Sequence, residues 1–151
     1  MRYQKRLFSL QDLIFDEEGK LLVVKPTYKN YWHIPGDVIE NNESPYCACI
    51  REVLEETNLE VIPLRLLAVN YTGIEEEKIG ALVFVSNCRN IKSDLKRNIK
   101  IPEDEIEDFR FIDKKDVYKY LDERIAKIVD EYFKSMIKNE TIYLDNMKRI
   151  L

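Results

Sequence analysis

Hydrophobic and polar residues follow one another along this chain in blocks that predict a mixture of strands and helices. Short apolar runs bounded by glycine, proline or acidic residues are typical of strands. They cover residues 8–15, 21–24, 31–34, 61–71, 78–86 and 109–112. The polar residues 16–20 predict a hairpin turn between the first two runs, and residues 87–104 predict a polar loop.

Two regions carry helical periodicity instead. Residues 117–137 predict a short helix followed by a longer one, whereas the tail 141–151 is ambiguous. The apolar stripe from Ile125 to Ile137 either packs on a sheet or forms a homodimer interface, and the sequence leaves both open.

The other helical region, residues 45–57, is clearly delimited. Ser44 is a good N-cap, Pro45 suits the first helical position, and Asn58 tolerates the left-handed conformation that ends a helix. The apolar residues on the side away from its glutamates are expected to face the core: Tyr46, Ile50, Val53 and Leu54.

Three glutamates of this helix, Glu52, Glu55 and Glu56, fall on one narrow stripe. Like charges at such spacings repel by roughly 0.2–0.5 kcal/mol per pair. Each carboxylate near the negative end of the helix dipole costs about 0.3–1 kcal/mol more. The stripe is either a solvated acidic face or a site for hard divalent cations, and oxygen ligands suit Mg²⁺ or Mn²⁺.

Length, charge and hydropathy narrow the class of protein. The 151 residues predict a single domain spanning 1–151, and the net charge of −4 comes without a basic stripe. We therefore expect no nucleic-acid polymer as a partner. No apolar run approaches the roughly 20 residues that span a bilayer, and the N-terminus lacks a signal-peptide pattern. The sequence thus predicts a cytoplasmic protein without a membrane partner.

The three cysteines are Cys47, Cys49 and Cys88. Cys47 and Cys49 lie two residues apart on the predicted helix and point in different directions, which argues against a structural zinc site. Reduced thiols in the core are the simpler interpretation.

The spacing of residues around the acidic helix carries more specific information. Gly36 and Asp37 precede Glu43 and the segment Arg51-Glu52-Val53-Leu54-Glu55-Glu56, which ends in Thr57-Asn58-Leu59. This arrangement resembles the signature of Nudix (MutT-like) hydrolases, with the Nudix box at residues 37–59. Asp37 and Asn58 stand where the two box glycines belong. Asn is the next-best residue for positive φ, whereas Asp37 adds a side chain near the expected site.

The resemblance implies an α/β fold, the Nudix fold, in which a mixed β-sheet is sandwiched between α-helices. It also implies a hydrolase that acts on phosphoanhydride bonds: water attacks a phosphorus of a nucleoside diphosphate linked to another moiety. Glu52, Glu55 and Glu56 match the metal-binding glutamates, with Mg²⁺ or Mn²⁺ as the cofactor. Gly36 matches the position whose carbonyl often completes the metal shell. Arg51 matches a supporting position that orients the glutamates. Glu43 matches a position that acts either as a structural hydrogen-bond acceptor or as a metal ligand.

Family members often recruit a further acid as general base. Here Glu105, in an acidic run before a strand, is the first candidate and Glu103 the next; the alternative is a solvated acidic loop. Trp32, Tyr28 and Lys25 are candidates for binding the small-molecule nucleotide, although packing near the turn is the favoured explanation for Trp32.

The only histidine, His33, either contacts phosphate or points outward. Marker patterns of the NADH, ADP-ribose and dinucleoside polyphosphate subfamilies are missing, so the substrate stays open. A second hypothesis, prompted by Asp37, is a Nudix-fold domain that senses a nucleotide without cleaving it.

Overall fold

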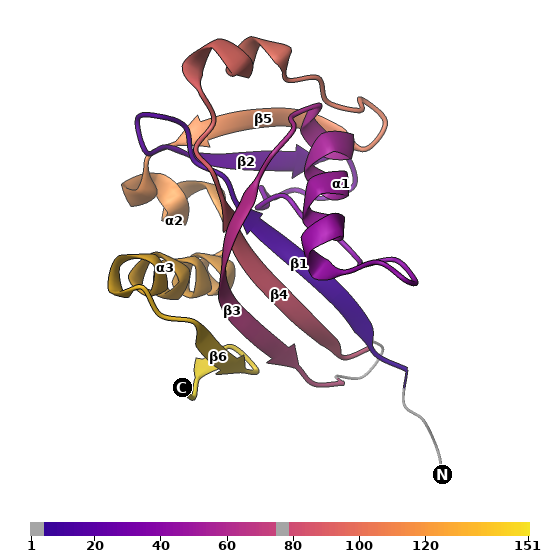
Figure 1. Cartoon of the computed structure of the whole chain (residues 1–151), viewed down its shortest axis with the longest axis vertical. Coiled ribbons are helices and arrows are strands. Elements are labelled where there is room, and N and C mark those ends of the chain that lie inside the picture. Colours follow the sequence, from indigo (N-terminus) through magenta and orange to yellow (C-terminus); the bar gives the residue numbers. More distant parts are fainter. Residues whose placement is uncertain (1–4, 75–78) are drawn as a thin grey trace.

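A computed structural model describes residues 5–74 and 79–151 and arranges them around a five-stranded sheet (Figure 1). The strands are β1 (Leu7–Leu13), β2 (Leu21–Pro26), β3 (Pro63–Thr72), β4 (Ala81–Cys88), β5 (Ile106–Ile112), β6 (Ile142–Asp145) and β7 (Lys148–Arg149). The helices are α1 (Pro45–Thr57), α2 (Val117–Tyr120) and α3 (Glu123–Lys138), with 3₁₀ turns η1 (Ser93–Asn98) and η2 (Lys114–Asp116).

The large sheet is mixed, as expected. Its order is β1-β4-β3-β6-β7, in which β1 runs parallel to β4 and β6 parallel to β3. The β3–β4 and β6–β7 pairs are antiparallel. A separate antiparallel pair, β2–β5, lies beside one end of the sheet (Figure 1).

Helices cover both faces of the large sheet, with α1 on one side and α3 on the other (Figure 1). Each helix seals its own apolar core. On the α3 side, Val129 and Tyr132 pack with Leu67 and Val85 of the sheet. On the α1 side, Cys49 and Val53 pack with Leu22, Cys88 and their neighbours. The expected sandwich of a mixed sheet between helices is confirmed.

The predicted hairpin between the first two apolar runs is confirmed only beside its turn, where Phe15 and Leu21 form an antiparallel bridge. The turn itself exists, since the Asp16 amide donates to the Lys20 carbonyl (3.0 Å) and the Leu22 amide to the Ile14 carbonyl (2.8 Å). Beyond that turn the chains diverge, and β1 pairs with β4 while β2 pairs with β5. A local turn signal does not determine which distant strand completes each ladder.

The remaining predicted elements are found with shifted bounds. Residues 61–71 become β3, residues 109–112 extend into β5, and 117–137 divides into α2 and α3. Residues 31–34 form no strand, only a single bridge between His33 and Val24. The tail contains β6 and β7, and the predicted loop 87–104 contains η1. Residues 75–78, which include the predicted start of a strand at Lys78, lie outside the described residues.

Helix α1 begins and ends as its sequence predicts. The Ser44 hydroxyl accepts from the Cys47 amide (3.1 Å), Pro45 opens the helix, and Asn58 adopts φ 63°. Its predicted core face is wrong, however: Val53 is buried and Ile50 partly so, but Tyr46 and Leu54 are exposed. The helix is rotated so that its buried residues are Ala48, Cys49, Glu52, Val53 and Thr57. The glutamates therefore border the core instead of lying opposite to it.

Within the two described stretches, no helix has both the length and the apolar character needed to cross a membrane.

Candidate active site

A cavity of about 570 Å³ lies between the glutamate face of α1 and the loop that follows β2. Its walls are formed by Val24, Pro26, Tyr28, Lys29, His33, Gly36, Asp37, Val38, Glu40, Arg51, Glu52, Glu55, Glu56, Glu105 and Ile106. Six of these residues are carboxylic acids, whereas Lys29 and Arg51 are the two with cationic side chains. The volume falls in the range of about 300–1,000 Å³ that is typical of small-molecule sites.

Gly36 brings the chain close to β1 beside the cavity. The Leu10 amide donates to the Asp37 carbonyl and the Asp12 amide to the Pro35 carbonyl, both at 2.9 Å. Gly36 has φ +141°, and a Cβ added there would lie 2.1 Å from the Leu10 carbonyl oxygen. The position therefore requires glycine, which explains why the chain keeps this residue directly before Asp37.

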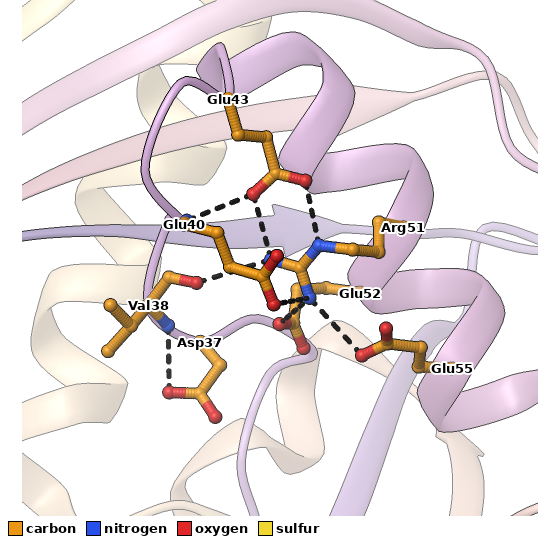
Figure 2. Close-up of polar contacts among 7 residues, drawn as sticks. All are labelled: Asp37, Val38, Glu40, Glu43, Arg51, Glu52 and Glu55. Carbon is orange, nitrogen blue, oxygen red and sulfur yellow. Dashed lines mark hydrogen bonds and ion pairs between the residues drawn. The ribbon is translucent and has the colours of Figure 1, made fainter.

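Arg51 holds several acids of the site in place (Figure 2). Its Nε and Nη2 bind the two oxygens of Glu43 at 2.7 and 2.9 Å, a bidentate ion pair. Its Nη1 contacts Glu52 at 2.5 Å and Glu55 at 3.2 Å. Glu43 also accepts from the Glu40 amide (3.0 Å), so both of its oxygens are engaged. This arrangement favours the structural role of Glu43 over direct metal binding.

The three glutamates of the stripe differ in exposure. Glu52 is buried, Glu56 is half-buried and Glu55 is exposed. Burial, together with the negative charge of Glu52, raises the pKa of Glu56 to about 8, although the Gly36 amide opposes the shift. Burial likewise raises the pKa of Glu52, with the Arg51 contact opposing it. Glu56 is therefore largely protonated at neutral pH unless positive charge is brought to it, whereas for Glu52 burial favours the neutral form and Arg51 the ionised one.

The donor set fits a hard cation. Glu56 has a buried oxygen, Oε2, without a hydrogen-bond partner in the described part of the chain. Carboxylate oxygens are the preferred ligands of Mg²⁺ and Mn²⁺. Glu52 and Glu55 turn toward Arg51, and Glu56 toward Gly36, so binding one ion requires side-chain rotation.

Asp37, the main departure from the box, also lines the cavity. Its own Oδ1 accepts from the Val38 amide at 2.8 Å (Figure 2), and its φ is not positive. Its carboxylate adds to the charge that raises the pKa of Glu52 and Glu56. Asp37 therefore fits without backbone strain and makes the site more acidic.

The wall opposite α1 carries His33, Tyr28 and Lys29. Burial, reinforced by the charge of Lys29, lowers the pKa of His33 to about 4, so the imidazole is neutral at pH 7. The Lys29 ammonium lies 5.5 Å from the ring centroids of both Tyr28 and Tyr31. His33 lines the cavity, whereas the alternation of residues along the chain left the direction of its side chain open. Lys29 was missed because nothing in its local sequence marks it.

Glu105 lies on the cavity wall, whereas Glu103 is not among the lining residues. Trp32 and Lys25 do not line the cavity either. Trp32 packs edge-to-face on Tyr120 (5.6 Å between centroids), and Lys25 pairs with Glu107 at 2.9 Å. Of the three predicted nucleotide-binding residues, Tyr28 is therefore the one at the cavity.

The chain is similar to known proteins in both sequence and fold. Residues 13–132 match the family model for the NUDIX domain. The chain is 36% identical over 53 residues to a MutT-like protein of Streptomyces ambofaciens. The alignment covers 35% of this chain and 34% of that protein. It is also 38% identical over 55 residues to an RNA pyrophosphohydrolase of Hydrogenovibrio crunogenus. That alignment covers 36% of this chain and 33% of that protein.

The chain spans about a third of the length of these two relatives. Among solved structures, the MutT protein from Methanosarcina mazei Go1 superposes with a TM-score of 0.72 at 18% identity. That superposition covers 93% of this chain and 100% of the other, so the two share their fold.

Proposed function

Because this chain belongs to the NUDIX domain family, we propose that it is a metal-dependent pyrophosphohydrolase whose substrate is a nucleoside diphosphate linked to another moiety. Its reaction is the attack of water on a phosphorus of the phosphoanhydride. Glu52, Glu55 and Glu56 are the proposed ligands of Mg²⁺ or Mn²⁺, with the backbone of Gly36 beside them.

The acidity of the cavity is the observation that supports this proposal best. Six carboxylic acids and two cationic side chains line it, and Glu56 has a buried oxygen without a partner in the described part of the chain. Two like charges about 4 Å apart repel by roughly 4 kcal/mol at an effective dielectric near 20. A diphosphate would be repelled from such a cavity unless divalent cations neutralised the acids. The cation would also lower the pKa of a bound water.

The chain's own residues have distinct proposed roles. Arg51 is occupied by Glu43, Glu52 and Glu55, so it orients these acids instead of binding phosphate. Lys29 lines the same cavity and forms no ion pair with a carboxylate among the described residues, which makes it the better phosphate-binding cation. The exposed ring of Tyr28 offers an aromatic face to a base beside it.

The test is phosphate release from nucleoside triphosphates, nucleotide sugars and related diphosphates with Mg²⁺ or Mn²⁺. We expect turnover by the parent, and a loss of about 10²-fold or more in kcat for Glu55→Gln and for Glu56→Gln. Glu60→Gln is the matched control, because Glu60 is an exposed glutamate just past α1 that does not line the cavity.

Equal rates in the parent and the two variants would contradict the assignment of the glutamates. A folded parent that binds nucleotides but cleaves none of them would favour the nucleotide-sensing alternative.

A further inference from the structure

A second group of metal-ligating side chains is buried and does not line the cavity. It comprises Asp12 of β1, Cys49 of α1 and Cys88 of β4, each about 1% exposed. One ligand atom from each lies within 4.8 Å of the other two, and the two sulfur atoms are 3.6 Å apart. Three elements that are distant in sequence thus converge on one point.

Asp12 is the unexplained member of this group. Neither of its carboxylate oxygens has a well-formed hydrogen bond to any described residue. Buried carboxylates are normally paired with a cation or accept several hydrogen bonds, because desolvation is costly. The Cys49 thiol is nearby, but a thiol is a weak donor. A carboxylate in this position is readily explained if it binds an ion.

We propose that Asp12, Cys49 and Cys88 form a second metal site, which takes a thiolate-preferring divalent cation such as Zn²⁺. Two thiolates and one carboxylate suit this class of ion, whereas Mg²⁺ prefers oxygen ligands alone. Its ligand chemistry differs from that of the cavity glutamates, and none of its three residues lines the cavity.

The distances match such an ion. With Zn–S bonds of about 2.3 Å and tetrahedral angles, two sulfur ligands lie about 3.8 Å apart, close to the 3.6 Å observed. At the same tetrahedral angles, a Zn–O bond of about 2.1 Å places the oxygen about 3.6 Å from each sulfur ligand. The three ligand atoms lie within 4.8 Å of one another, so the Asp12 carboxylate must move toward the two sulfur atoms to complete the site.

Charge is consistent with a site that takes up a cation and releases protons. The hydrogen bond with Cys88 and burial both raise the pKa of the Cys49 thiol, so the free thiol stays protonated. A bound cation must displace those protons, and its affinity consequently rises with pH.

The consequence concerns the catalytic helix. Cys49 lies three residues before Glu52 on α1, while Asp12 and Cys88 belong to two neighbouring strands of the sheet. An ion at this point would fasten the helix that carries the glutamates to β1 and β4. Binding would stabilise the folded chain, and the stabilisation would grow with the logarithm of the free ion concentration once this exceeds the Kd.

Cobalt binding to the full chain tests the proposal. The reduced protein is stripped with a chelator under anaerobic conditions and titrated with Co²⁺, which reports sulfur ligands by thiolate-to-cobalt charge-transfer absorption. We expect this absorption to saturate at one equivalent, to disappear when Zn²⁺ is added, and to accompany a higher Tm. Ions held by the cavity glutamates have oxygen ligands and give no such band.

Variants locate the ligands. Cys49→Ser and Cys88→Ser are expected to abolish the band, and Asp12→Asn to weaken cobalt affinity by about 10-fold or more. Cys47→Ser is the matched control, because Cys47 is an exposed cysteine of the same helix, and Glu55→Gln should also keep the band.

The parent and the Cys47→Ser control can each overturn the proposal. It fails if the folded, reduced parent shows no charge-transfer absorption, or if Cys47→Ser removes it. The proposal would also be contradicted if Cys49 and Cys88 formed a disulfide and the protein still bound no cobalt after that disulfide was reduced. None of these results depends on whether the chain hydrolyses nucleotides.

Discussion

Glu56 combines a buried, unpartnered oxygen with a position on the cavity wall. The box pattern identified this residue, but its burial could not be foreseen, because periodicity placed the glutamates opposite the core. The rotation of α1 depends on which residues the strands offer for packing. For Asp37 the sequence indicated a departure from the box. In the structure its carboxylate accepts a hydrogen bond from the next backbone amide, that of Val38.

The raised pKa of Glu56 predicts how stability depends on pH without divalent ions. Between its ordinary value of 4.5 and about 8, the folded state keeps a proton that the unfolded state has lost. The free energy of unfolding should therefore fall as pH rises through this window, by at most about 1.4 kcal/mol per pH unit from this group. Asp12, with a pKa raised to about 7, adds a fall in the same direction.

Urea unfolding in chelator at a series of pH values measures this slope. Glu56→Gln, which cannot ionise, should show a flatter dependence than the parent. Mg²⁺ requires the ionised form, so its stabilising effect on the parent should grow with pH. Identical slopes for parent and variant would show that the Glu56 carboxyl is not desolvated in the folded state.

Glu105 provides a second prediction for a single residue. It lines the cavity, whereas its neighbour Glu103, in the same acidic turn, does not. If Glu105 is the general base, Glu105→Gln should lower kcat by about 10²-fold or more, with Glu103→Gln close to the parent. Steady-state kinetics with the best substrate measures both. A Glu103 variant that is equally impaired would assign the effect to the turn rather than to Glu105.

The sequence predicted the ends of helix α1 well, but it did not predict which face of the helix is buried. Caps are local, since Ser44, Pro45 and Asn58 act on the backbone within a few residues. Orientation is set by long-range packing, and it buried Cys49 and Glu52 instead of Tyr46. The same rotation makes Cys49, but not Cys47, a core thiol.

Arg51 links this helix to the loop before it, and its replacement should cost stability. Lysine cannot reproduce the bidentate contact with Glu43 while also binding Glu52. Arg51→Lys is expected to lower the free energy of unfolding by about 1–3 kcal/mol, as measured by urea denaturation. Arg89→Lys, at an exposed position, should change it by less than about 0.5 kcal/mol. Equal effects would mean that the Arg51 network contributes little.

At the scale of the whole molecule, the sandwich was predictable and the strand partners were not. Runs of apolar residues identified β3 and β4, and the box identified the fold family. The β1–β4 and β2–β5 pairings join segments far apart in sequence, so the turn at residues 16–20 misled. The predicted stripe in α3 packs on the sheet through Val129 and Tyr132, while homodimer formation stays a prediction.

We infer that residues 1–151 fold as a single domain, because the two apolar cores both contain residues of strands β2 and β4. A single cooperative unfolding transition would agree with this inference, whereas two separate transitions would contradict it.

The most direct measurement is anomalous diffraction from crystals soaked with Mn²⁺ and a slowly hydrolysed nucleotide analogue. We predict manganese density bounded by Glu52, Glu55 and Glu56, next to Gly36 and in contact with the analogue's diphosphate. Density for the analogue in the cavity without manganese at these glutamates, or manganese bound elsewhere with the three side chains in solvent, would contradict the account.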